Sequence, residues 1–225
     1  MSFETWYLEI PVITRCYFTV SVITTLACYF DVISPFTLYL NYRLIYEKLE
    51  IWRIFSNFFF FGMPSLDFVF HMYFLVRYCR WLEETSFRGK PADMLTMILF
   101  GASLMLVIAP FSSVFFLGHS LTFMMVYVWS RRNDHRMNFM GFFFFNAPYL
   151  PWVLLVFSMI LGASPVVDLV GILVGHLYYY LEDIVPRMPG RFHGKHLIFT
   201  PSLVHYMFEG PAPEGAPNLR VNFNP

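Results

Sequence analysis

Val167–Asp183 reads VDLVGILVGHLYYYLED, and the other apolar segments of the chain are best explained as packing around it. Gly171 and Gly175 are four residues apart, so on a helix they form a groove of small residues that a second backbone can approach closely. His176 lies beside that groove, and Asp168 lies about one turn before it. A helix that is apolar nearly all round but carries glycines and ionisable groups is typical of a membrane span at the centre of a bundle. The simpler interpretation is that the glycines only let two helices touch.

The composition indicates a membrane protein. Of 225 residues, 57% are hydrophobic and 13% are charged, whereas soluble domains average about 25% charged residues. Basic and acidic residues are equal at 15 each, so nothing indicates a nucleic-acid-binding face. The N-terminal sequence lacks the pattern of a cleaved signal peptide, and we expect the first span to act as an uncleaved signal anchor. Three widely spaced cysteines predict neither a disulfide framework nor a cysteine-based metal site.

Six apolar segments predict an all-α membrane protein. They run over Cys16–Ile33, Ile54–Val76, Met94–Ala109, Val114–Trp129, Tyr149–Leu161 and Val166–Leu181. Gly62-Met63-Pro64 interrupts the second segment, and Pro110 is expected to end the third. A straight span needs about 20 residues, so the third, fourth and sixth segments are short. Short spans imply a locally thinned bilayer or shelter behind neighbouring helices.

The distribution of basic residues predicts the orientation of the spans. The connections that follow the even-numbered spans, together with the C-terminal tail, hold eleven Lys and Arg residues, and the first connection holds three. This asymmetry puts both termini in the cytosol. We expect a membrane domain over residues 1–206 and a disordered cytosolic tail over residues 207–225, where proline and glycine are frequent.

Polar residues at membrane depth are costly and are therefore candidates for function. Asp67 and His71 are four residues apart on one helix face and could form an internal ion pair, which is a structural role. His193-x-x-His196 has a spacing found in zinc sites, but no further ligands accompany it, and no metal site is predicted. The polar residues that the segments place at depth are Asn57, Asp67, His71, Ser103, His119, Ser120, Asn146, Asp168 and His176.

Trp52-Arg53 lies where the first long connection meets the second apolar segment. An arginine at this place can donate hydrogen bonds to loop carbonyls, and a tryptophan can anchor at the lipid headgroups.

These features together resemble the rhomboid fold: six short spans, Trp-Arg in a long first connection, and Gly-x-x-x-Gly in the sixth span. The resemblance predicts a six-transmembrane-helix, rhomboid-like bundle. It narrows to the Derlin family, catalytically inactive relatives of the rhomboid proteases in the endoplasmic reticulum, and covers roughly residues 1–206. The stretches that carry it are Pro35–Asn41, Ile51–Gly62, Arg77–Ala92, Tyr127–Asn133, Ala147–Leu154 and Asp168–Asp183.

The resemblance implies a non-catalytic component of endoplasmic-reticulum-associated degradation, a multi-pass protein of that membrane with both termini cytosolic. Such a protein assists retrotranslocation of misfolded proteins to the cytosol through a thinned membrane and a lateral gate between spans two and five. A wet half-channel is one hypothesis for the substrate path, and the polar residues that could line it are Asn57, Asp67, His71, Asn146 and Asp168.

The partners that the resemblance implies are misfolded substrates, a membrane ubiquitin ligase complex, a cytosolic AAA ATPase and the lipid bilayer. Homo- or hetero-oligomers are left open, and no cofactor and no nucleic acid are implied. Derlins that recruit the ATPase directly often carry a Phe-Gly-containing box near the C-terminus. The tail here has no clear Phe-Gly pair, which argues against direct binding and for an adaptor.

Rhomboid proteases, by contrast, use a Ser–His dyad. Carried over by position, the serine site is Gly118 and the histidine site is Asp168, so the resemblance implies no catalytic residues. Gly118-His119-Ser120 nevertheless reads Gly-x-Ser, and an intramembrane serine protease that uses Ser120 and His176 is the alternative. A purely structural scaffold also remains open, whereas a channel or transporter would be expected to show paired broken helices or repeats.

Overall fold

The computed structural model describes residues 3–112, 114–139, 143–189 and 197–209, and these are mostly helical. Its longer helices are α2 (Val12–Tyr29), α5 (Leu66–Trp81), α6 (Pro91–Ser112), α7 (Gly118–Arg132), α8 (Leu150–Ile160) and α9 (Pro165–Tyr179). Shorter elements connect them: α1 (Phe3–Leu8), η1 (Pro35–Thr37), α3 (Tyr42–Lys48), α4 (Arg53–Ser56), η2 (Leu82–Ser86), β1 (Arg136–Phe139), β2 (Phe143–Asn146), η3 (Ala147–Tyr149), η4 (Tyr180–Ile184), η5 (Val185–Arg187) and α10 (Ser202–Glu209).

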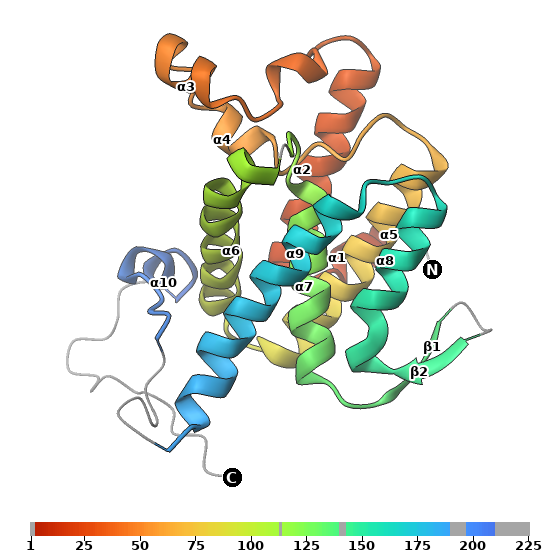
Figure 1. Ribbon diagram of the computed structural model, residues 1–225, viewed down its shortest axis with the longest axis vertical. Helices are drawn as coiled ribbons and strands as arrows, with labels where there is room; N and C mark the ends of the chain where they lie inside the picture. The colour runs from red at the N-terminus through yellow and green to blue at the C-terminus, as the bar shows by residue number, and fades with distance from the viewer. Residues whose placement is uncertain (1–2, 113, 140–142, 190–196, 210–225) are drawn as a thin grey trace.

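Helix α9 crosses α7 in the middle of the bundle, with α6 on one side and α5 and α8 on the other (Figure 1). The two glycines of α9 let the backbones meet. A Cβ on Gly171 would overlap the Ser120 carbonyl oxygen and lie 2.7 Å from the Phe123 Cβ. A Cβ on Gly175 would lie 3.1 Å from the Met124 carbonyl oxygen. The two glycines were expected to let a second helix approach closely, and that helix is α7. The residues of α7 are buried along almost its entire length.

The bundle has two ends that we name by what they carry. Helices α3 and α4 cover one end, and the β1–β2 hairpin lies at the other (Figure 1). We refer to these as the α3–α4 end and the hairpin end. Asp67, His119 and Asp168 all lie in the first turns of their helices, and these turns are at the α3–α4 end.

The lengths of the helices differ from the expected segments. Helices α2, with 18 residues, and α6, with 22, are long and apolar enough to cross a membrane by length and composition. Helices α7 and α8 have 15 and 11 residues, and at 1.5 Å per residue neither reaches the roughly 30 Å of a hydrocarbon core. Helices α5 and α9, with 16 and 15 residues, continue without a break into the π-helical turns η2 and η4. The third segment, predicted to be short, instead forms the longest helix.

Pro110 does not end α6. The backbone carbonyl that would normally accept a hydrogen bond from residue 110 accepts one from another residue. A proline at position 110 cannot donate to the carbonyl of Leu106, four residues earlier. The hydroxyl of Tyr42, from α3, donates to that oxygen instead. The helix therefore continues to Ser112, and α3 is fastened to its side.

The second apolar segment is two separate helices rather than one interrupted span. Helix α4 is a single turn, and α5 begins only at Leu66 and continues past Val76 to Trp81. Gly62 has φ of +94°, a conformation that glycine adopts without strain. The side chain of Ser65 then caps α5 by accepting a hydrogen bond from the Phe68 N–H at 3.2 Å.

The hairpin contains one of the predicted polar residues. Strands β1 and β2 pair antiparallel, with Arg136 opposite Asn146. Asn146 is exposed at the end of β2 and precedes α8, and its place at membrane depth stays a prediction. The apolar residues just before the fifth segment form strand β2, because they pair with β1.

The C-terminal part of the described chain packs on the bundle. Helix α10 lies beside α6 (Figure 1), and the Thr200 hydroxyl donates to Asp93 Oδ1 at 2.5 Å. The predicted domain boundary after residue 206 falls inside α10. Residues 210–225 lie outside the described residues, as do His193 and His196, so the disordered tail remains a prediction.

Candidate functional site

Arg53 organises the connection at the α3–α4 end. Its side chain is buried, and its Nη1 donates to the carbonyl oxygens of Phe36 at 2.9 Å and Tyr39 at 3.1 Å. Its Nε pairs with Glu50 Oε2 at 2.6 Å, and its guanidinium lies 4.9 Å from the centre of the Tyr39 ring. The side chain of Trp52 is instead exposed. The arginine thus ties down a long loop, and the tryptophan is free to meet lipid.

Asn57 and Gly118 fix the same region to the start of α7. The Asn57 side chain donates to the carbonyl of Arg53 at 2.6 Å, and its backbone carbonyl accepts from the Leu117 N–H at 3.1 Å. A Cβ on Gly118 would lie 2.7 Å from the Phe58 carbonyl oxygen. Glycine at the position that matches the rhomboid serine therefore has a packing reason.

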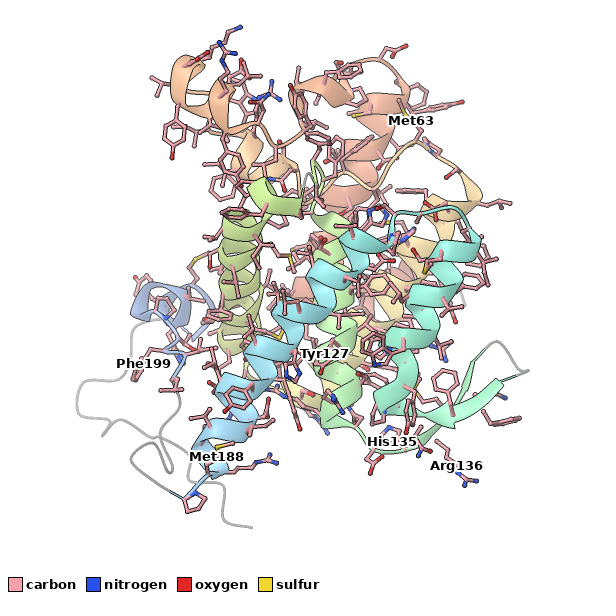
Figure 2. The ribbon with its side chains drawn as sticks, viewed as in Figure 1. Met63, Tyr127, His135, Arg136, Met188 and Phe199 are labelled. Atoms are coloured by element: carbon pink, nitrogen blue, oxygen red, sulfur yellow. The ribbon has the colours of Figure 1, made fainter. Side chains whose placement is uncertain are left out.

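Ser120 and His176 do not form a dyad. The Ser120 hydroxyl donates to the Val167 carbonyl oxygen at 2.6 Å, whereas His176 Nδ1 is 2.7 Å from the Tyr127 hydroxyl. Gly171 is the α9 residue that meets Ser120, and His176 lies five residues further on, about 7.5 Å along the helix. Figure 2 shows Tyr127 in the middle of the bundle. The alternative of a protease built on these two residues therefore lacks its geometry.

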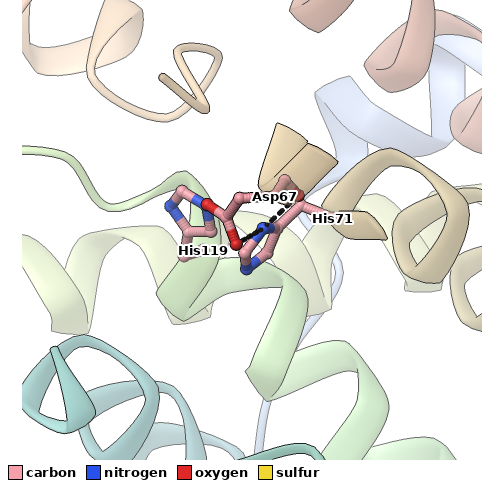
Figure 3. A group of neighbouring side chains, drawn as sticks. All are labelled: Asp67, His71 and His119. Carbon is pink, nitrogen blue, oxygen red and sulfur yellow. Dashed lines mark hydrogen bonds and ion pairs between the residues drawn. The ribbon is translucent and has the colours of Figure 1, made fainter. Parts of the chain in front are cut away.

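Three other polar residues meet at the α3–α4 end, and we call them the Asp67 cluster: Asp67, His71 and His119 (Figure 3). His71 Nδ1 is 2.8 Å from the Asp67 carbonyl oxygen and 3.2 Å from Asp67 Oδ1. The rings of His71 and His119 have centroids 4.0 Å apart. The expected Asp67–His71 pair is present, but His119, on a different helix, joins it.

Asp168 lies near this cluster at the start of α9. Its side chain is 2% exposed, and within the described part of the chain its Oδ2 has no hydrogen-bond partner. The carboxyl interacts electrostatically with that of Asp67. Asp67, His71, His119 and Asp168 thus join Asn57 at the α3–α4 end of the bundle, while Asn146 lies at the other end.

Aromatic side chains bridge the space between α5 and α8. The Phe157 ring meets Phe70 at 5.6 Å and Phe74 at 6.4 Å between centroids, both edge to face. Beside them is a cavity of about 20 Å³ that His71 and Ser158 help to line, which is room for about one water molecule. These are the helices of the second and fifth segments, between which a lateral gate was expected.

The hairpin end holds contacts that sequence reasoning missed. Glu83 is buried and accepts hydrogen bonds from the N–H groups of Ile13 at 3.1 Å and Thr14 at 2.9 Å. Arg132 and Asp183 form an ion pair at 2.9 Å between α7 and η4. Nothing in the sequence links Glu83 to Ile13 and Thr14, which lie 70 and 69 positions earlier in the chain. The one available signal is that no side chain caps the start of α2, so its first N–H groups need an acceptor from elsewhere.

A cavity of about 460 Å³ opens at the same end. Figure 2 labels His135 and Arg136, which are on its rim. Trp81 and Trp129 line it, with ring centroids 5.1 Å apart, and the Arg77 guanidinium lies 4.7 Å from the Trp81 ring. The basic rim agrees with the positive charge that the sequence concentrates at this end.

Comparisons with known proteins agree with the resemblance. The model of the Der1-like family matches residues 10–202. The chain is 49% identical to Derlin-2.1 of Zea mays over 217 residues, covering 91% of this chain and 86% of that protein. It is 50% identical to Derlin-2.2 of Arabidopsis thaliana, covering 91% and 87%. It is 43% identical to the probable derlin-2 homolog of Dictyostelium discoideum, covering 92% and 84%.

Proposed function

The chain belongs to the Der1-like (Derlin) family, and on that premise we propose that it is a non-catalytic component of endoplasmic-reticulum-associated degradation. In this role it assists the retrotranslocation of misfolded proteins to the cytosol. The observation that carries the proposal is the family match over most of the chain.

The geometry of the rhomboid dyad positions supports a protein without protease activity. Gly118 is pressed against a backbone carbonyl, and Asp168 carries a carboxyl where the protease has its histidine. Ser120, the remaining serine of the Gly-x-Ser sequence, already donates its hydroxyl to the Val167 carbonyl. A hydroxyl that donates to a backbone carbonyl directs its proton at a group too weakly basic to take it.

The proposed mechanism is a thinned bilayer beside a lateral gate. Helices α7 and α8 have only 15 and 11 residues, and helices that short draw the lipid surfaces together. The contact between α5 and α8 is made by phenylalanine rings rather than by interlocked backbones. A polypeptide that enters there would cross less hydrocarbon, with Asn57, Asp67, His71 and Asp168 as polar groups near its path.

The proposal includes a topology and a set of partners. Six spans over a membrane domain of residues 1–206 place the α3–α4 end in the lumen and the basic hairpin end, with both termini, in the cytosol. Misfolded substrates enter from the lumen or the bilayer. A membrane ubiquitin ligase complex and a cytosolic AAA ATPase, reached through an adaptor, complete the pathway.

The test is the degradation of a misfolded endoplasmic-reticulum reporter in cells that lack this protein. Wild type and Ser120→Ala should restore degradation equally, because loss of one hydroxyl hydrogen bond costs only about 1 kcal/mol. Arg53→Ala should restore little, because it frees the Phe36 and Tyr39 carbonyls and leaves Glu50 without its partner. The half-life of the reporter, followed after synthesis is stopped, is the measurement.

Arg43→Ala is the matched control. Arg43 lies in the same connection, but its ion pair with Glu47 is exposed, and such pairs contribute about 0–1 kcal/mol. It should restore degradation fully. If Ser120→Ala is folded but inactive and a cleaved reporter fragment disappears with it, the protein is a protease. If Arg53→Ala assembles with its partners and moves substrate normally, the connection that Arg53 holds is not needed for retrotranslocation.

A further inference from the structure

The Asp67 cluster has the composition of a metal site. One carboxylate oxygen and one nitrogen from each of the two histidines lie within 4.8 Å of one another. Two imidazoles and a carboxylate, with a fourth position left for water, form a donor set common in zinc sites. Asp67 and His71 come from one helix at a spacing of four, and His119 comes from a second helix, so the three donors converge from two sides (Figure 3).

His71 is oriented as a ligand. Its Nδ1 faces the Asp67 carbonyl oxygen at 2.8 Å, so that nitrogen carries the proton and Nε2 keeps its lone pair. Histidines that bind metals almost always donate their second ring N–H to a carbonyl or carboxylate, which fixes the tautomer and the direction of the ring. The backbone of α5 thus presents His71 Nε2 in the form that a cation requires.

The remaining donors have no other partner in the described part of the chain. Apart from the ion pair with His71 Nδ1 at 3.2 Å, the buried atom Asp67 Oδ1 has no hydrogen-bond partner, and no hydrogen bond involves either ring nitrogen of His119 there. The His119 ring packs edge to face against His71 and Phe61. A buried oxygen without a hydrogen bond, such as Asp67 Oδ1, is costly, and a cation shared with the two histidines would satisfy it.

The charge around the cluster favours a divalent ion. Asp168 is buried, and its carboxyl interacts electrostatically with that of Asp67, so two carboxylates near one another repel each other in a place where charge is costly. A divalent ion would balance both. The Asp67 side chain is 42% exposed, which gives an ion a way in from the α3–α4 end.

We propose that Asp67, His71 and His119 bind a Zn²⁺ ion. In a tetrahedral site with bonds of about 2.0–2.1 Å the donors lie roughly 3.3 Å apart, so small side-chain rotations close the present spacing. Water takes the fourth position, and Asp168 stabilises the site through its charge. The ion links α5 to α7. Of the two helices in the α5–α8 contact, α8 is therefore the one that can move. The sequence alone predicted no metal site, because spacing revealed only two of the three ligands.

The experiment measures zinc bound to the full-length protein, purified in detergent with a tag that contains no histidine. After dialysis against Zn²⁺ and removal of free ion, elemental analysis should give one ion per chain. His119→Gln and His71→Asn should each lower the affinity by more than the roughly 10–100-fold that losing a supporting hydrogen bond costs. Zn²⁺ should also raise the thermal unfolding temperature of the wild type and leave that of both variants unchanged.

Two matched controls separate this site from other histidines. His176→Gln removes a histidine that bonds to Tyr127 on the same bundle, and the double change His193→Ala/His196→Ala removes the histidine pair of the tail. Both should keep one ion per chain. Zinc lost with the tail pair, or retained by folded His119→Gln, would overturn the proposal.

Spectroscopy on the wild type covers the case in which a cluster variant does not fold. Co²⁺ in place of Zn²⁺ should give the strong visible bands of a tetrahedral ion without a thiolate charge-transfer band, and zinc X-ray absorption should show two imidazoles and no sulfur. A parallel titration with Fe²⁺ identifies the case in which iron is preferred, since two histidines and a carboxylate also suit ferrous iron. Absence of bound metal in all arms means that His71 and Asp67 form an ion pair only.

Discussion

Gly171 has little freedom to change. Its missing side chain is where the Ser120 carbonyl of α7 lies. Gly171→Val should destabilise the protein by at least about 1–3 kcal/mol, the usual cost of forcing extra carbons into a packed core, because the obstacle is backbone rather than a flexible side chain. The measurement is thermal unfolding of the purified protein, together with its elution as a single species.

Leu173→Phe is the control for this change. Leu173 lies on the same helix but is 50% exposed, so the added volume meets lipid or detergent. A normal unfolding temperature for Gly171→Val beside a normal one for Leu173→Phe would mean that α9 does not pack on α7 through Gly171.

Single residues also show what a sequence can and cannot predict. The spacing of Gly171 and Gly175 and the pairing of Asp67 with His71 follow from helix periodicity, and both were accessible. His119 and Glu83 were not predicted in their roles. Each acts across 48 or more positions of chain, and their partners are determined by how helices pack, which periodicity does not encode.

At the scale of elements, α2 depends on a residue that is not part of it. Pro11 precedes α2 and provides no side-chain cap, and Glu83 of η2 accepts from the first free N–H groups. A negative charge at a helix N-terminus is also favoured by the helix dipole. Glu83→Gln should therefore lower the free energy of unfolding by about 1–3 kcal/mol, measured by chemical or thermal unfolding in detergent.

The neighbouring Glu84→Gln provides the comparison. Glu84 differs from Glu83 by one position, and its ion pair with Arg80 is partly exposed, so its loss should change stability by less than about 1 kcal/mol. Equal changes in the free energy of unfolding for the two variants would show that the hydrogen bonds from α2 to Glu83 do not stabilise the protein.

The elements that were predicted correctly are those whose apolar runs form single helices, such as α8 and α9. The errors concern Pro110, which was expected to end a helix, and the residues just before the fifth segment. Pro110 failed as a stop signal because Tyr42 supplies the hydrogen bond that Pro110 cannot. The hairpin before α8 was missed because four consecutive phenylalanines show neither helical nor alternating periodicity.

For the whole molecule, the contact between α5 and α8 is the place where the bundle is expected to open. Aromatic pairs contribute about 0.5–1.5 kcal/mol, so Phe157→Ala should raise the open population about two- to tenfold. A reporter cysteine at Ser158, in a protein without Cys16, Cys28 and Cys79, should then react faster with a hydrophobic maleimide by that factor.

Val156→Ala tests whether the effect belongs to the contact. Val156 is adjacent on α8 but 56% exposed, and the same reporter should react at the rate seen without the change. A reaction rate that Phe157→Ala leaves unchanged would argue that the gate lies elsewhere.

The packing of α9 against α7 has a consequence in time. The ribosome completes α7 before it makes α9, because α9 starts at Pro165 and α7 ends at Arg132. During that interval the side of α7 that will receive the two glycines faces lipid or another protein. The other helices cannot reach their final arrangement until the one they surround has been synthesised and inserted. The helices of this protein therefore reach their final packing only late in its translation.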